Sequence, residues 1–379
     1  MQFYKRARRL SAVTAVAAAL MLVAACGSDD AAAGGGSGGG GKVDSKGLAE
    51  AKALVQQYST RPTEIPNKTP ITAEVPTGKK LAFISCGTSN CTLESDIIKS
   101  ATDQLGWTLE TINTDGTPEK VKAAWQQILR DKPDGVLYSA TDRAVFEPEL
   151  QEASKAGIEV AACCTVDKPD GALDYVIGTP QQSADVGKLI AAWVIADSGG
   201  SADSVYIDLS VFKILGSVRD TYEQTMDDLC GDCSYDTLDI PITSLGKDVP
   251  DKIVSYVRAH PDVKYVALST DGLSAGLPAA LKAAGLNDVK VIGEGPDETT
   301  LADIAGGQRA ASIAFPYYEE MYSMVDSMVR LFTGTPLEDS ADIAIPNWIL
   351  TADNLPSSTE LFPLVEDVKE QYFALWGVS

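Results

Sequence analysis

Between residues 79 and 307 the chain alternates short apolar runs with longer segments that repeat apolar residues at helical spacing. The runs are rich in β-branched residues, which is typical of buried strands, whereas the longer segments carry an apolar residue every three or four positions, which indicates amphipathic helices. The predicted strands span residues 81–85, 108–113, 135–140, 158–164, 204–210, 235–242, 263–270 and 289–295. The predicted helices span residues 93–106, 118–132, 144–157, 183–199, 217–231, 249–261, 276–286 and 298–307.

This alternation predicts an α/β fold of parallel sheets with helices on both faces, because consecutive parallel strands need a helical crossover. The units fall into two series, so we expect two similar doubly wound lobes rather than one large sheet. In open α/β sheets a ligand binds at the carboxyl ends of the strands. A cleft between two facing lobes would collect the loops that follow each strand, and the ligand site is expected there.

The flanking segments have a different character. The stretch "KGLAEAKALVQQY" predicts a short helix, and the four prolines in "STRPTEIPNKTPITAEVPTGKK" predict an extended segment that lies across a surface. Near the C-terminus, "SSTELFPLVEDVKEQYFALWG" predicts an amphipathic helix that packs on the body. Its apolar side is expected to carry Leu361, Leu364, Val365, Val368, Tyr372 and Trp376.

The N-terminus is typical of an exported chain. The basic stretch "MQFYKRARRL" precedes an apolar run that is too short for a stable membrane span, as in a secretory signal peptide. The following "LVAAC" resembles a lipobox, in which Cys26 becomes the diacylated mature N-terminus; a plain signal with a chance cysteine is the alternative. Residues 26–45 are Gly-rich and predict a flexible tether. We therefore expect a lipid-anchored protein at the extracytoplasmic face of the cell membrane.

The charge balance narrows the range of partners. The 379 residues include 31 Lys and Arg against 53 Asp and Glu, a formal net charge of −22. A chain with this net negative charge is repelled by nucleic acid and by an anionic membrane surface, so neither is an expected partner. The single histidine, His260, lies between a predicted helix and strand, which excludes a His-based triad or a His-rich metal site.

Seven cysteines permit disulfides in an exported chain. With Cys26 set aside, the candidates are Cys86, Cys91, Cys163, Cys164, Cys230 and Cys233. We expect Cys86–Cys91 to pin a cleft loop and Cys230–Cys233 to form a structural clip where a helix ends. Three arrangements stay open for Cys163 and Cys164: a vicinal ring facing the ligand, bonds across to Cys86 and Cys91, or two buried thiols.

The order of elements and several short matches together resemble the ribose-type, type I periplasmic binding proteins of ABC importers. The matches are "KPDGVLYSATD", "AGIEVAA", "AHPDVKYVALSTDGLSAGLPAALKAAG", "VKVIGEGPDE" and "GGQRAASIAFPYYEEMY". The resemblance implies two lobes that clamp a ligand, joined by three crossings near Gly178–Gln182, Ala314–Pro316 and Ile343–Trp348. The expected division is 1–25 signal, 26–45 tether, 46–78 N-terminal helix and wrap, 79–180 plus 316–345 lobe 1, 181–315 lobe 2, and 346–379 C-terminal crossing and helix.

The sequence departs from the sugar-binding pattern of that family. An aspartate–arginine pair after the fourth strand is replaced by Cys164 and Thr165, and further family positions for sugar contacts hold Gly295 and Phe315. A site without these charged groups would leave sugar hydroxyls unpaired. We therefore expect a ligand that is not a simple pentose or hexose and is more apolar. The candidate ligand-binding residues are Cys86, Thr88, Asn90, Cys91, Asp142, Cys163, Cys164, Thr165, Phe212, Ser217, Arg219, Thr270, Asp271, Glu294, Phe315 and Tyr317.

These features predict a binding protein without a catalytic residue, cofactor or metal. Its expected partners are a small-molecule ligand, the permease of an ABC importer and, through the N-terminal lipid, the membrane; it is expected to be a monomer. Two alternatives stay open. The first is a receptor of the same fold that signals to a membrane protein, and the second is an extracellular thiol oxidoreductase that uses the cysteine pairs.

Overall fold

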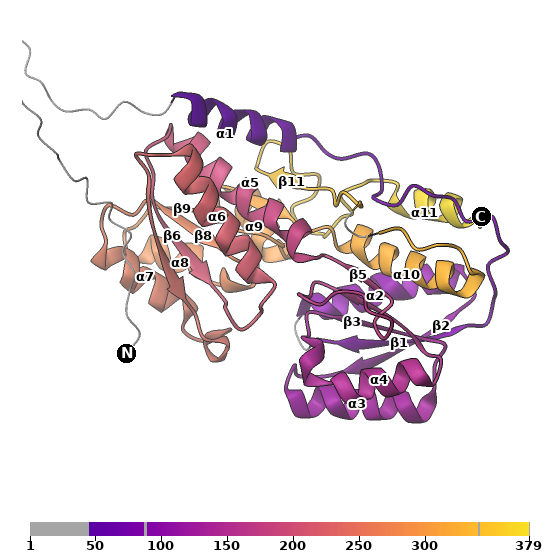
Figure 1. Cartoon of the computed structure of the whole chain (residues 1–379). Helices are drawn as coiled ribbons and strands as arrows, with labels where there is room; N and C mark the ends of the chain where they lie inside the picture. Colours follow the sequence, from indigo (N-terminus) through magenta and orange to yellow (C-terminus); the bar gives the residue numbers. More distant parts are fainter. Residues whose placement is uncertain (1–44, 87–88, 340–341, 379) are drawn as a thin grey trace, which may run out of the picture.

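The computed structural model describes residues 45–86, 89–339 and 342–378. The predicted signal peptide, Cys26, the tether up to residue 44 and Thr88 lie outside these residues. Two parallel sheets, each covered by helices, form two lobes, which confirms the predicted α/β fold (Figure 1). Within the described ranges, no helix combines the length and apolar character needed to cross a membrane.

Lobe 1 is built on a five-stranded parallel sheet with the order β2-β1-β3-β4-β5. Alternate residues of β1 point to opposite faces, so Leu81 and Phe83 join the core under α2 and α10, whereas Ala82 and Ile84 join the core under α3 and α4. The strands are β1 (Lys80–Ser85), β2 (Thr108–Asn113), β3 (Gly135–Ser139), β4 (Glu159–Cys163) and β5 (Tyr175–Ile177). The helices are α2 (Ser89–Gln104), α3 (Pro118–Asp131), α4 (Glu147–Lys155), α10 (Tyr317–Thr333) and α11 (Val368–Trp376).

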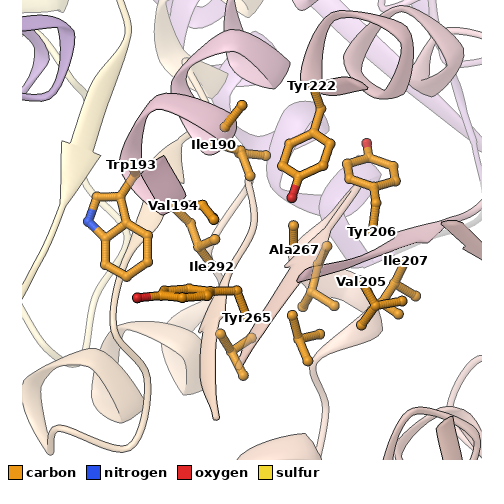
Figure 2. Close-up of a cluster of buried hydrophobic side chains, with 14 of the residues drawn as sticks. Ile190, Trp193, Val194, Val205, Tyr206, Ile207, Tyr222, Tyr265, Ala267 and Ile292 are labelled. Carbon is orange, nitrogen blue, oxygen red and sulfur yellow. The ribbon is translucent and has the colours of Figure 1, made fainter. Parts of the chain in front are cut away.

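Lobe 2 is built on a four-stranded parallel sheet with the order β7-β6-β8-β9. Its core is rich in aromatic residues: Tyr206 of β6 lies against Tyr222 of α6, and Trp193 of α5 packs edge-on to Tyr265 of β8 (Figure 2). The strands are β6 (Asp203–Asp208), β7 (Ser234–Asp239), β8 (Tyr265–Leu268) and β9 (Lys290–Ile292). The helices are α5 (Pro180–Ser198), α6 (Leu215–Leu229), α7 (Val249–Ala259), α8 (Leu277–Ala283) and α9 (Glu298–Ala305).

The chain runs between the two sheets at three places. It leaves β5 for α5, whose N-terminus is closed by a capping box between Thr179 and Gln182. It returns from β10 (Ser312–Ala314) to α10, and it crosses again before β11 (Trp348–Leu350), which pairs antiparallel with β10. The side-chain amide of Gln182 donates to the carbonyl of Ile343 at 2.9 Å, so two of the crossings are bonded to each other.

The N-terminal segment also connects the lobes. Helix α1 (Ser45–Tyr58) packs on α5 and α6 of lobe 2, where Ala51 joins the core (Figure 1). The proline-rich segment then runs to lobe 1, and the carbonyl of Pro76 accepts a 2.6 Å hydrogen bond from the indole of Trp107. The extended wrap that the prolines predict is therefore a strap from one lobe to the other.

The structure differs from the sequence prediction at the C-terminal helix, and it contains β5, β10, α10 and β11, which the prediction leaves out. The C-terminal helix begins only at Val368, so Leu361, Leu364 and Val365 of the expected apolar side precede it; Leu364 joins a small core with Trp348. The short strand β5 was not predicted, since three residues after an irregular segment carry too little periodicity. It extends the sheet beyond β4 and leads directly into the first crossing.

Candidate functional site

A cavity of about 410 Å³ lies between the lobes, where loops at the carboxyl ends of the strands meet. Lobe 1 contributes Cys86, Glu94, Ser139, Ala140 and Cys164, and lobe 2 contributes Leu209, Phe212, Ile214, Leu215, Leu245, Thr270, Gly272, Glu294 and Gly295. Phe315 and Tyr317 come from the second crossing. Most of this surface is apolar, as in many small-molecule sites.

Two larger hollows lie elsewhere among the described residues. One, of about 630 Å³, surrounds Cys230, Cys233 and His260 at the opposite end of the lobe 2 strands, and the other, of about 810 Å³, lies beside the hinge near Pro169 and Leu337. We assign the ligand site to the smaller interlobe cavity because both lobes and a crossing contribute to it.

Cys163 and Cys164 are joined as a vicinal disulfide, the first of the three arrangements considered. Cys163 ends β4 and is fully buried, whereas Cys164 lines the cavity with a left-handed backbone (φ 61°). Such a conformation costs energy in a non-glycine residue and is found disproportionately at functional sites. The ring therefore forms part of the cavity wall.

A buried carboxyl supports this ring from behind. Oε2 of Glu320 in α10 lies 3.2 Å from Sγ of Cys163 and 3.4 Å from Sγ of Cys164. Burial, together with the neighbouring Glu94, Glu294 and Glu319, raises the pKa of Glu320 well above its ordinary value. Since disulfide sulfurs carry no proton, the neutral carboxyl is the donor in these contacts.

The other two preferred cysteine pairs are also formed. Cys86 is bonded to Cys91, and Cys230 is bonded to Cys233. Cys86 lines the cavity, while Cys91 is completely buried in the first turn of α2. This bond ties the loop after β1 to the helix that carries Glu94.

Two carboxyl groups reach the cavity from opposite lobes. Glu94 of α2 is 4% exposed, and Glu294, which follows β9, is 6% exposed. Burial raises the pKa of Glu94 to about 8, and the nearby Ser139 offsets only part of that effect. Burial and, secondarily, Asp271 raise the pKa of Glu294 to about 8. Both groups are therefore poised to gain or lose a proton near neutral pH.

Asp271 lies behind the cavity wall rather than in it. Its carboxylate pairs with Arg309, which is equally buried, and accepts a 2.5 Å hydrogen bond from the hydroxyl of Ser312. Its backbone N–H donates to the carbonyl of Glu294 at 2.7 Å. Asp271 therefore holds the β8 and β9 loops together and positions Glu294.

Asp142 and Thr165 line a small hollow next to the cavity, together with Phe212. The carboxylate of Asp142 in lobe 1 pairs with the ammonium of Lys213 in lobe 2, so an ion pair joins the lobes at the edge of the cleft. Asp142 also accepts from the N–H of Ala144 at 3.1 Å, so its carboxylate caps the short helical turn that follows.

Ser217 and Arg219 lie on α6 and do not line the cavity. The hydroxyl of Ser217 donates to the carbonyl of Ile214 at 2.8 Å. Arg219 pairs with Asp208 at 2.9 Å and with Asp220 at 2.7 Å. Both side chains therefore support the lobe 2 wall from outside.

Seven of the candidates named from sequence line the cavity: Cys86, Cys164, Phe212, Thr270, Glu294, Phe315 and Tyr317. Cys91 and Cys163 stand directly behind it through their disulfides, and the side chain of Asn90 is outside the described residues. Sequence reasoning missed Glu94 and the apolar wall of Leu209, Ile214, Leu215 and Leu245. The one local feature that could have placed Glu94 at the cleft is its position one helical turn after Cys91, on the same side of the predicted helix.

The sequence matches the periplasmic binding protein domain family over residues 92–336, and the chain belongs to that family. Members of the family are extracytoplasmic binding proteins rather than enzymes, and they bind small molecules for ABC transporters. No curated protein matches the sequence significantly.

Solved structures share the fold at low sequence identity. The 5-methylthioribose transporter solute binding protein from Thermotoga lettingae, in complex with 5-methylthioribose, has a TM-score of 0.67 at 16% identity over 81% of this chain and 99% of its own. The glucose-galactose binding protein GanP from Geobacillus stearothermophilus has a TM-score of 0.63 at 19% identity over 74% and 100%. A chain of a mutant XylFII–LytSN complex has a TM-score of 0.54 at 15% identity over 74% and 100%.

Proposed function

We propose that this protein is the solute receptor of an ABC importer, acting as a monomer anchored to the extracytoplasmic face of the membrane by acylated Cys26. The observation that carries the proposal is the cavity at the strand ends, lined by both lobes and by the second crossing. Closure of the lobes around a small molecule would present a surface to the permease. Binding and release complete this task, so it needs no catalytic group or cofactor.

The proposed ligand is less hydroxylated and more apolar than a simple pentose or hexose. The described residues that line the cavity include no Arg, Lys, Asn or Gln, the side chains that usually form paired hydrogen bonds with sugar hydroxyls. Each sugar hydroxyl left without a partner would cost roughly 1–3 kcal/mol. The fold relative with 5-methylthioribose supports the idea, because a methylthio group is apolar where ribose has a hydroxyl.

A second function is a ligand-sensing receptor that binds a membrane-associated protein. It is favoured by one observation, the fold relative from a mutant XylFII–LytSN complex. Purification of the full chain with its native membrane neighbours would separate the two proposals. Copurification of a permease and its ATPase favours import, whereas copurification of a sensor protein favours the second function.

The experiment that tests solute binding is a thermal-melt screen of the full, non-reduced chain in detergent. One panel contains sugars and polyols, and the other contains aromatic acids, terpenoids and steroid fragments. A compound at 100 times its dissociation constant stabilises the folded state by about 2.7 kcal/mol, which raises Tm by several degrees. A shift with the apolar panel supports the proposal, a shift with sugars alone overturns the proposed ligand, and no shift with either panel argues against a solute receptor of this type.

A further inference from the structure

The interlobe cavity contains two acidic side chains that no cation in the described part of the chain pairs with. Glu94 and Glu294 are the two carboxyl groups in its lining, and they come from opposite lobes. The cationic side chains of the surrounding lobes have other partners: Arg309 pairs with Asp271, Arg219 with Asp208, and Lys213 with Asp142. The carboxyls of the cavity therefore face an apolar space with no counter-ion among the described residues.

One carboxyl oxygen in the cavity is buried without a hydrogen-bond partner. Oε2 of Glu94 makes no hydrogen bond to any described residue, although the side chain is only 4% exposed. Native proteins rarely bury such an atom unpaired, because the lost solvation is not recovered. Although the Ser139 hydroxyl lies near enough to lower the pKa of Glu94, Oε2 itself has no partner within the described ranges, so it can accept a hydrogen bond from a bound ligand.

The two carboxyls act on the same part of the cavity. Glu94 and Glu294 each raise the pKa of the Tyr317 hydroxyl, and each also raises the pKa of Glu320 behind the vicinal disulfide. Tyr317 lies in ring contact with Phe315, at a centroid distance of 4.5 Å. A positive group near Tyr317 would meet carboxylates from both lobes and the faces of two aromatic rings.

We propose that the ligand is an apolar molecule with a protonated amine at one end, and that Glu94 and Glu294 hold this amine between the lobes. The inference rests on the proposed function as a solute receptor and names its ligand class. The apolar body lies along Leu209, Phe212 and Leu215 of lobe 2, opposite the sulfur ring of Cys164. Because the two glutamates come from facing lobes, an amine that bridges them stabilises the closed arrangement.

This arrangement makes binding depend on pH. Glu294 lies near Asp271 and its partner Arg309. Glu94 lies near Ser139 and, behind the cavity, Glu320. With both glutamates neutral below pH 8, an amine must displace a proton to bind as an ion pair. Affinity for the amine is therefore expected to rise from pH 6 towards pH 8, by up to tenfold per pH unit for each glutamate that loses its proton on binding.

The test compares three probes of matched size on the full chain in detergent at pH 8: 4-phenylbutylamine, 4-phenylbutan-1-ol and 4-phenylbutanoate. We expect the amine to bind at least tenfold more tightly than the alcohol by calorimetry, and the carboxylate not to bind. Glu94→Gln and Glu294→Gln should each weaken amine binding at least tenfold and leave alcohol binding unchanged or improved. Asp96→Asn and Glu298→Gln remove exposed acids from α2 and α9 and serve as matched controls that leave binding unchanged.

The outcomes separate the ligand class from the proposed function. If the amine and the alcohol bind with equal affinity and Phe212→Ala weakens both, the proposed amine ligand is wrong. The proposal of a receptor for an apolar solute then still stands. Unchanged amine affinity in both glutamine variants would also overturn it. Failure of the amine to bind, together with a melt shift from a neutral apolar compound, rejects the ligand class alone, and failure of every compound in both screens rejects the solute receptor too.

Discussion

Sγ of Cys164 lies 3.4 Å from Oε2 of Glu320, so a disulfide at the end of β4 rests on a fully buried carboxyl of α10. Helix α10 begins directly after the second crossing. The contact therefore links the cavity surface to the segment that connects the lobes. A change at the vicinal disulfide is expected to affect ligand binding more than folding.

The first prediction concerns removal of this ring by Cys163→Ala/Cys164→Ala. Adjacent residues close almost no loop, so the bond restricts the unfolded chain little and Tm should change by only a few degrees. The cavity loses its sulfur face, and we expect affinity for the compound that stabilises the protein in the melt screen to fall about tenfold. Calorimetry on both proteins checks the result.

The matched control is Cys230→Ser/Cys233→Ser, which removes a disulfide at the opposite end of lobe 2. It should leave affinity unchanged. Equal affinity of the wild type and the Cys163/Cys164 variant would mean that the ring supports β4 without contributing to the ligand surface.

The second prediction is that the ligand-free protein becomes less stable between about pH 4.5 and pH 8. Burial raises the pKa of Glu94 and Glu294 to about 8 and that of Glu319 to about 7, so the folded state binds more protons than the unfolded state in this range. Each such carboxyl lowers the free energy of unfolding by at most about 1.4 kcal/mol per pH unit. The contribution of each carboxyl to stability is fully present below its pKa in the unfolded chain. It is lost as pH rises through its pKa in the folded protein.

Urea unfolding at pH 5, 6, 7 and 8 measures this slope. Glu94→Gln/Glu294→Gln should flatten it, because the amides do not ionise. Ion pairs lower the pKa of surface aspartates such as Asp288, which lies beside Lys264. These groups titrate at lower pH, so they do not change the slope between pH 5 and pH 8. An identical slope in the variant would show that these two carboxyls are not desolvated in the ligand-free protein.

The third prediction concerns how closely helices pack around α6. A Cβ at Gly47 of α1 would lie 2.8 Å from the carbonyl carbon of Leu229, and a Cβ at Gly187 of α5 would lie 2.8 Å from that of Val218. Gly47→Ala and Gly187→Ala should each destabilise lobe 2 by about 1–3 kcal/mol, since backbone must move. Urea unfolding followed by circular dichroism provides the measurement.

Gly216 supplies the control on α6 itself, because a Cβ there meets only the flexible end of Arg219 at 3.9 Å. Gly216→Ala should be neutral or should stabilise by about 0.5–1 kcal/mol, the usual effect in a helix. A stabilising Gly47→Ala would contradict the close packing of α1 on lobe 2 and so the anchoring of the strap.

The elements that the sequence could predict are those with strong periodicity and local end signals. The strand "IEVAACC" was recognisable because its apolar run stops at a polar turn, and this placed Cys163 and Cys164 at the cleft. The role of Asp271 was not recognisable, since its partners Arg309 and Ser312 lie 38 and 41 residues away in sequence. Such pairing depends on how the β8, β9 and β10 loops meet, which no local pattern encodes.

Glu94 illustrates the same limit on the cavity. A glutamate in an amphipathic helix is usually solvated, and nothing local distinguishes it from the exposed Asp96 two residues later. What buries Glu94 is the arrangement of α2 against the cleft and the bond from Cys86 to Cys91. Sequence can therefore locate the cleft, whereas the chemistry of its walls depends on tertiary packing.

The last prediction concerns the ion pair between Lys213 of lobe 2 and Asp142 of lobe 1. Partial burial alone would raise the pKa of Asp142, but the bond to Lys213 lowers it overall, so the pair persists at mildly acidic pH. Because it joins the lobes at the edge of the cleft, Lys213→Gln should speed ligand release by roughly two- to fivefold, the range of an exposed pair. Stopped-flow dissociation at low salt measures the rate.

Lys252→Gln removes a partly exposed pair within lobe 2, that with Asp248, and should leave release unchanged. The difference between Lys213→Gln and wild type should shrink as salt rises, since exposed charges are screened. Asp142→Asn in the Lys213→Gln background should add little, because the interaction is already lost. Additive effects of the two substitutions would show that Lys213 and Asp142 act independently, and the ion pair would then have no part in holding the lobes together.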